Sequence, residues 1–309
     1  MEMFDLSLFD FAAVWSPDWI IASAGIGLLY FLIVNGPLRQ SFPNAKRVPL
    51  PKQLSFYTGL FCLYLVMGGP FDLLGHFMFS IHMTKMAIMY LIVPPLMIYG
   101  MPDWFFLGFE RWNRLRKVFR FFTHPILSVL LFTGFFSLYH MPFVFDLSMT
   151  NAYVRTLYNT VLLVTAFFSW WPLMSPLPSR DETSDFKKIG YLYMGAFLLL
   201  PSCALIVFGE TPYYKTYTDP QTWATALGLC VSGDPAALLA SFGGPEQFSK
   251  LTPLLDQRVG GIIMKVMQEI VYGIVLTYVY YKWVAKEKAR EAEEQNLANQ
   301  PHGYYTQVQ

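Results

Sequence analysis

Long apolar stretches alternate with short polar segments along most of the chain. Seven of these stretches are long and apolar enough to cross a bilayer as a helix of about 20 residues. They cover residues 18–35, 53–69, 74–99, 125–141, 153–173, 189–209 and 260–283. Turn-forming sequences such as Asn35-Gly36-Pro37 and Gly68-Gly69-Pro70 separate them. The pattern predicts an all-α, polytopic membrane protein built as a bundle of seven transmembrane helices.

The basic side chains predict how this bundle is oriented. Of the 22 Lys and Arg residues, 16 lie in every second loop and in the C-terminal tail. These segments follow the first, third, fifth and seventh apolar stretches. Because basic loops stay on the cytoplasmic side of a membrane, the N-terminus is expected outside and the C-terminus in the cytoplasm.

Two regions follow from this orientation. Residues 1–285 are expected to form the seven-helix transmembrane domain, with a long external loop at 210–259 that contains short surface helices. Residues 286–309 are expected to form a polar cytoplasmic tail, partly disordered and helix-prone at its start. The first residues are acidic and carry no Lys or Arg, so we expect no cleavable signal peptide.

Composition narrows the class of protein further. Charged residues make up 14% of the chain and hydrophobic residues 54%, with a mean hydropathy of +0.37. A soluble domain carries about 25% charged residues, so this composition argues against a soluble protein. The net charge of +1 and the absence of a basic stripe argue against a nucleic-acid partner. The cysteines Cys62, Cys203 and Cys230 form no CxxC pair. No nucleophile–base pair is visible, so we expect no enzymatic activity.

Ionisable side chains within the apolar stretches are the first candidates for function, because they are costly to insert into a membrane. At 100° per residue, His82, Lys85 and Met86 share one face of the predicted helix 74–99. His76 and Met83 share the opposite edge of that helix. His140, at the end of 125–141, lies at the same outer level as His76.

Imidazole and thioether groups together are typical ligands of copper, and methionine favours Cu(I). The candidate metal ligands are therefore His76, His82, Met83, Met86 and His140. Ordinary packing is the competing interpretation, since methionine fills cores and a buried histidine can bond to a neighbouring helix. His124, on the other side of the membrane, is expected to be a polar residue at a helix start.

A second polar group lies in the last apolar stretch. Lys265 and Glu269 are four residues apart, with Gln268 beside them. An internal ion pair that helps to pack the bundle is the favoured interpretation. A proton or partner contact is the functional alternative, and Glu269 could also pair with Lys85.

Five segments resemble the CtaG family of cytochrome c oxidase assembly factors, which are linked to caa3-type oxidases of Bacillus-like bacteria. The segments are SIHMTKM–PPLMIYGMP (80–102), YHMPFVFD (139–146), WWPLMSPLP (170–178), FGETPYYKTYTD (208–219) and DQRVGGIIMKVMQEI (256–270). The resemblance implies a seven-helix protein of the bacterial cell membrane that is needed to make active oxidase. Many members have a second histidine at the position that Met86 occupies here, so a copper site would be softer in this chain.

The resemblance implies an assembly factor for haem–copper cytochrome c oxidase, with oxidase subunits and the lipid bilayer as partners. It would assist copper insertion or subunit maturation in the outer half of the membrane. A metal-free scaffold for oxidase subunits is one alternative. A haem-binding protein with His76, His82 or His140 as axial ligands is another. A retinal protein is disfavoured, because Lys85 stands where a carboxylate counter-ion would be required.

Overall fold

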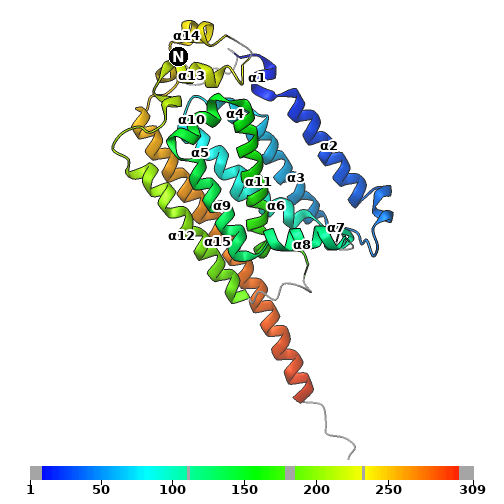
Figure 1. The fold of residues 1–309 in the computed structure, drawn as a ribbon. Helices are drawn as coiled ribbons and strands as arrows, with labels where there is room; N and C mark the ends of the chain where they lie inside the picture. The colour runs from blue at the N-terminus through cyan, green and yellow to red at the C-terminus, as the bar shows by residue number, and fades with distance from the viewer. Residues whose placement is uncertain (1–8, 110–111, 178–184, 232–233, 299–309) are drawn as a thin grey trace, which may run out of the picture.

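The structure is a computed structural model that describes residues 9–109, 112–177, 185–231 and 234–298. Every regular element in these ranges is helical (Figure 1). The main bundle contains α2 (Pro17–Val34), α3 (Leu50–Met67), α5 (Phe79–Ala87), α6 (Val93–Gly100), α9 (Pro125–Tyr139), α11 (Ala152–Met174), α12 (Asp185–Phe208) and α15 (Pro253–Ala298). The most extensive helix contacts join α12 with α15, α3 with α6, α5 with α15 and α9 with α11.

Five helical segments in the described ranges are long and apolar enough to span a membrane. They cover Phe11–Val34, Phe79–Gly100, Ala152–Met174, Lys187–Phe208 and Pro253–Asn296. A sixth is obtained if α8 (Asn113–Phe122) and α9, which are bent by 64° at their junction, form one span. Helix α3 forms where a span is predicted but is not among these five segments. It begins at Leu50, and its polar first turn with Lys52 and Gln53 lowers its mean hydropathy.

The predicted helix 74–99 is broken at its start, which corrects the prediction that all its residues share one helix. Helix α4 (Pro70–Leu74) ends before His76, and α5 begins at Phe79 after Met78 adopts an extended backbone with φ −136° and ψ 133°. His76 therefore does not share a helix with His82, Lys85 and Met86. The prediction that His76 lies on the opposite edge of the same helix was therefore wrong.

A π-helical turn, η3 (Ile88–Ile92), joins α5 to α6. Pro94 lacks an N–H group, so the carbonyl of Tyr90 loses its usual partner four residues on. The indole of Trp170, on α11, donates a hydrogen bond to this carbonyl at 2.8 Å. The proline pair thus creates an acceptor inside the bundle, and a side chain of a neighbouring helix satisfies it.

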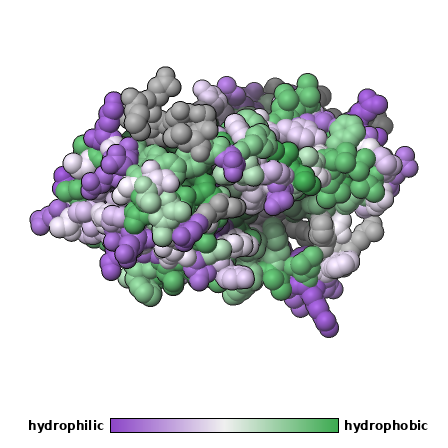
Figure 2. Space-filling model, turned by 90° about the horizontal axis from the view of Figure 1, so that it is seen from above, coloured by the Kyte–Doolittle hydropathy of each residue, from purple (hydrophilic) through white to green (hydrophobic). Residues whose placement is uncertain are grey.

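One end of the bundle carries a cap with its own core. The cap contains α1 (Phe11–Trp15), η4 (Lys215–Tyr217), α13 (Pro220–Leu227), α14 (Pro235–Phe242) and η5 (Pro245–Gln247) (Figure 1). Val14, Leu73, Phe77 and Trp223 are buried together in it. Seen from this end, hydrophilic residues are scattered over the surface with hydrophobic residues between them (Figure 2). Short helices do form within 210–259, as predicted.

The opposite end carries basic segments and the polar end of α15 (Figure 1). Helix η2 (Pro37–Ser41), α7 (Asp103–Phe109) and α8 lie there, and α8 contains four Lys or Arg residues. At the cap end of the bundle, α10 (Pro142–Thr150) follows α9. Helix α15 continues without a break across the predicted boundary at 285–286, while residues 299–309 of the predicted tail lie outside the described ranges.

Candidate functional site

Two histidines from different helices approach the same tyrosine. His82, on the first turns of α5, is 3% exposed, and its ring centroid lies 6.0 Å from that of Tyr139 with the rings nearly parallel. His140 directly follows α9 and is 6% exposed, with its ring centroid 5.2 Å from Tyr139. Tyr139 is itself 1% exposed. The structure thus places two of the predicted ligands beside the same tyrosine.

The Nε2 atoms of both imidazoles are buried and have no hydrogen-bond partner among the described residues. The Nδ1–H group of His140 donates to the carbonyl of Phe136 at 2.7 Å. This bond leaves Nε2 of His140 as the lone-pair nitrogen of the neutral ring. An unsatisfied buried polar atom is unfavourable unless a ligand or water completes it, so these two nitrogens point to a binding site.

Aromatic side chains close this site toward the cap. The ring of Phe79 stacks on Tyr214 at 4.7 Å between centroids, and Phe145 lies 5.0 Å from the ring of His82. The hydroxyl of Tyr214 donates to the carbonyl of His140 at 3.0 Å. The hydroxyl of Tyr217 donates to Gly75 O at 2.6 Å, which holds the 214–217 segment in place. These aromatic residues were not among the candidates that the sequence predicted for the site.

The two predicted methionine ligands differ in their surroundings. Met86 is fully buried and lies one helical turn after His82 on the same face of α5. Met83 is also fully buried but contacts α15, where its Cγ would lie 3.0 Å from a Cβ added to Gly260. Met86 therefore remains the candidate thioether for the histidine pair, and Met83 packs between helices.

His76 belongs to a different cluster, between α4 and α5. Its Nδ1 donates to the carbonyl of Asp72 at 2.9 Å, and its Nε2 lies 3.1 Å from Nη1 of Arg155, which donates to it. The Sγ atom of Cys230 lies 3.5 Å from Nε2 of His76 and 3.4 Å from Arg155 Nη1. Both ring nitrogens of His76 thus have partners, unlike the Nε2 atoms of His82 and His140.

Burial sets the protonation state of this cluster. It lowers the pKa of His76 to about 4, against the opposing attraction of Asp72, so the imidazole is neutral at pH 7. Burial also raises the pKa of the Cys230 thiol to about 11. Cys230 is therefore a protonated thiol. Its contact with His76 could not be predicted from the sequence, because the two residues are 154 positions apart.

The intramembrane lysines have separate partners. Lys85 is buried and pairs with Asp72, which lies on α4. Lys265 pairs with Glu269 at 2.5 Å, as favoured from the sequence, and Glu269 does not pair with Lys85. The pair on α15 is not internal to the bundle, however, because the Glu269 side chain is 58% exposed.

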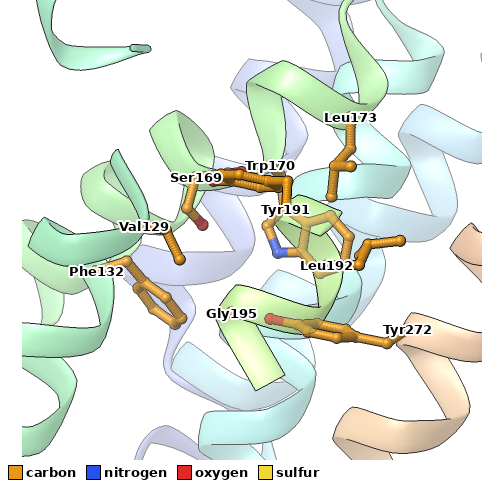
Figure 3. Close-up of a pocket in the computed structure, with 9 residues that line it drawn as sticks. All are labelled: Val129, Phe132, Ser169, Trp170, Leu173, Tyr191, Leu192, Gly195 and Tyr272. Carbon is orange, nitrogen blue, oxygen red and sulfur yellow. The ribbon is translucent and has the colours of Figure 1, made fainter. Parts of the chain in front are cut away.

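A small cavity lies in the other half of the bundle, among α9, α11, α12 and α15 (Figure 3). Its walls include Trp170 and Tyr272, whose rings meet edge to face at 5.6 Å between centroids. The hydroxyl of Tyr191 donates to Ser169 O at 2.6 Å beside it. The cavity measures about 10 Å³, which is room for about one water molecule. None of the predicted site residues lines it.

Only a site of mixed ligands can hold a metal ion at the histidine pair. In the part of the chain that the structure describes, no three His, Cys, Asp or Glu side chains converge on one point. Two neutral imidazole nitrogens with one thioether fit Cu(I), a soft ion that accepts low coordination with such ligands, better than zinc.

The comparison with known families confirms the resemblance found in the sequence. The family model described as cytochrome c oxidase caa3 assembly factor (Caa3_CtaG) matches residues 28–286, which is most of the chain. No curated protein and no solved structure gave a match. The matched range includes α5, α9, α11 and the whole cap except α1, so it contains both histidines of the site. The chain belongs to the family of caa3 cytochrome c oxidase assembly factors.

Proposed function

We propose that this protein assists the copper step of caa3 oxidase assembly by holding Cu(I) at the His82–His140 pair and releasing it to an oxidase subunit. The observation that carries the proposal is the pair of buried imidazole Nε2 atoms without partners beside Tyr139. His82 and His140 would bind the ion, and Met86 would supply a weaker thioether ligand. The role is binding and transfer, without catalysis.

The proposal includes the placement of the chain in the membrane. The protein is a multi-pass protein of the bacterial cell membrane with seven spans, α3 and the bent α8–α9 pair included. The N-terminus lies outside and the C-terminus in the cytoplasm, because segments rich in basic residues, such as η2 and α8, lie at the end of the bundle opposite the cap. The histidine pair then lies in the outer half, next to the cap, where a partly assembled subunit can receive copper laterally.

Copper content of the purified protein tests this proposal. Detergent-purified protein loaded anaerobically with Cu(I) is expected to retain about one ion per chain. His82→Ala combined with Met86→Leu, and separately His140→Ala, are expected to lose it. His124→Ala is the matched control, since His124 lies before α9 at the other end of that helix. Copper retained by the first two variants, or absent from the wild type, contradicts the site.

A metal-free scaffold is the second candidate, supported by the lack of a convergent group of three His, Cys, Asp or Glu ligands in the described ranges. In this case the variants at His82 and His140 would keep full oxidase activity in cells, while changes in the cap would reduce it. A Soret absorbance band in the purified protein would instead indicate haem bound by a histidine.

A further inference from the structure

The ion pair on α15 lies at the edge of a helix face that points out of the bundle. The Glu269 side chain is 58% exposed and that of Lys265 is 29% exposed. The residues around them on this face are apolar and at least half exposed: Val266 is 50% exposed and Ile270 57%. The opposite face, with Met264, Gln268 and Val275, is buried against the bundle.

The pair lies deep within the apolar part of α15. Glu269 follows Gly260, near the start of the apolar stretch, by nine residues, which is ~13 Å along a helix. This depth falls inside a hydrocarbon core of about 30 Å. Ionisable groups at such a depth almost always face a bundle interior or a water-filled cavity. An exposed carboxylate here indicates a surface that another protein covers.

Small and polar residues extend this surface along α15. Gly273 and Thr277 follow Glu269 at intervals of four residues and are both exposed. No atom of the described residues, apart from the helix's own backbone, lies within 4 Å of a Cβ built on Gly273. Small residues let a second transmembrane helix approach closely, and polar side chains then form hydrogen bonds across the contact.

We propose that the face formed by Lys265, Glu269, Gly273 and Thr277, called the α15 face below, binds a transmembrane helix of a different protein that carries a hydrogen-bond donor to Glu269. The carboxylate is the more exposed member of the pair, so the partner must complement an acceptor. A second copy of this chain fits poorly, because a two-fold contact on this face would offer Glu269 only Lys265, which already pairs with it within the same helix, and so would add no new donor. That the partner is an oxidase subunit rests on the proposed function.

Photocrosslinking in cell membranes that contain the oxidase tests this inference. The crosslinking amino acid p-benzoylphenylalanine replaces Gly273, and for the matched control it replaces Phe197, which is 71% exposed on α12. We expect a product with an oxidase subunit, identified by mass spectrometry, from position 273 and not from position 197. Combining Glu269→Leu with Lys265→Leu removes both charges from a lipid-compatible helix and should lower the yield roughly tenfold.

A product only with a second copy or with lipid, or an unchanged yield in the double variant, would overturn the inference. The result is separable from the copper proposal. Glu269→Leu with Lys265→Leu should leave Cu(I) binding by the purified protein unchanged, since the pair does not contact the histidine site. If copper binding fails while the crosslink to the oxidase subunit remains, the α15 face stands and the copper site does not.

Discussion

His76 shows how the neighbours of one side chain decide its chemical role. By residue type it resembles His82 and His140, and all three are buried. The difference lies in the Nε2 atom. Arg155 donates a hydrogen bond to Nε2 of His76, whereas Nε2 of His82 and of His140 has no partner among the described residues. Residue type predicted three similar ligands, but only His82 and His140 keep a buried ring nitrogen without a partner among the described residues.

The state of His76 predicts a dependence of stability on pH. Asp72, Lys85, Arg155 and Cys230 surround the imidazole, and burial lowers its pKa to about 4 from 6.5. Between these values the unfolded chain binds a proton that the folded chain does not, so stability falls as pH decreases from about 6.5 to 4. The slope from this residue approaches ~1.4 kcal/mol per pH unit.

Thermal unfolding in detergent across this pH range checks the prediction. His76→Gln, which cannot titrate, should show a shallower loss of Tm between pH 6.5 and 4 than the wild type. His124→Gln serves as the control and should follow the wild type. Parallel curves for the wild type and His76→Gln would contradict the assignment.

The start of α5 shows that a helix end can depend on another helix. Met78, the residue before α5, has no side-chain capping bond. The carboxylate of Asp256, on α15, accepts the backbone N–H groups of Phe79 at 2.6 Å and Ser80 at 3.3 Å. These are groups that a capping residue of the same segment usually satisfies. Asp256, which is 177 positions from Phe79, thus helps to set where α5 begins, and with it the position of His82 in the first turn of that helix.

Removing this carboxylate should destabilise the fold. Asp256→Ala leaves two buried N–H groups without an acceptor, which is expected to cost about 1–3 kcal/mol. Asp234→Ala is a matched control, because Asp234 precedes α14 at its N-terminus without a side-chain capping bond. The Tm in detergent measures both variants. Equal Tm values would show that Asp256 does not stabilise the start of α5.

The whole molecule has two unlike ends, and this asymmetry predicts its orientation. The cap of short helices covers one end, while α7, α8 and the polar end of α15 lie at the other (Figure 1). Basic segments remain cytoplasmic during insertion, whereas a cap with few Lys and Arg residues can be translocated.

Reporter fusions test the orientation. Alkaline phosphatase, which is active only outside the cytoplasm, is expected to be inactive after Ala298 and active when inserted between Gly243 and Gly244 in the cap. A fluorescent protein that folds in the cytoplasm should give the reverse pattern. Phosphatase activity after Ala298 would show that the number of spans is even or that the orientation is inverted.

The positions of several long helices follow directly from the pattern of apolar residues. The predicted stretches 18–35, 125–141 and 153–173 correspond to α2, α9 and α11 within two residues at each end. In a membrane each helix must satisfy its own backbone hydrogen bonds, and the bilayer sets its length. Local composition is therefore sufficient to place such a helix. The family could likewise be recognised from short local motifs, without the tertiary structure.

The grouping of side chains did not follow from that pattern. The break at residues 75–78, the pairing of Lys85 with Asp72 and the exposure of Glu269 each depend on which helices pack together. The predicted grouping of His76 with a face of helix 74–99 failed because it assumed one continuous helix. Which face of a helix meets protein and which meets lipid depends on contacts between segments far apart in the chain. These contacts bring His82 and His140 to Tyr139 and leave Glu269 at the surface, and no local pattern contains them.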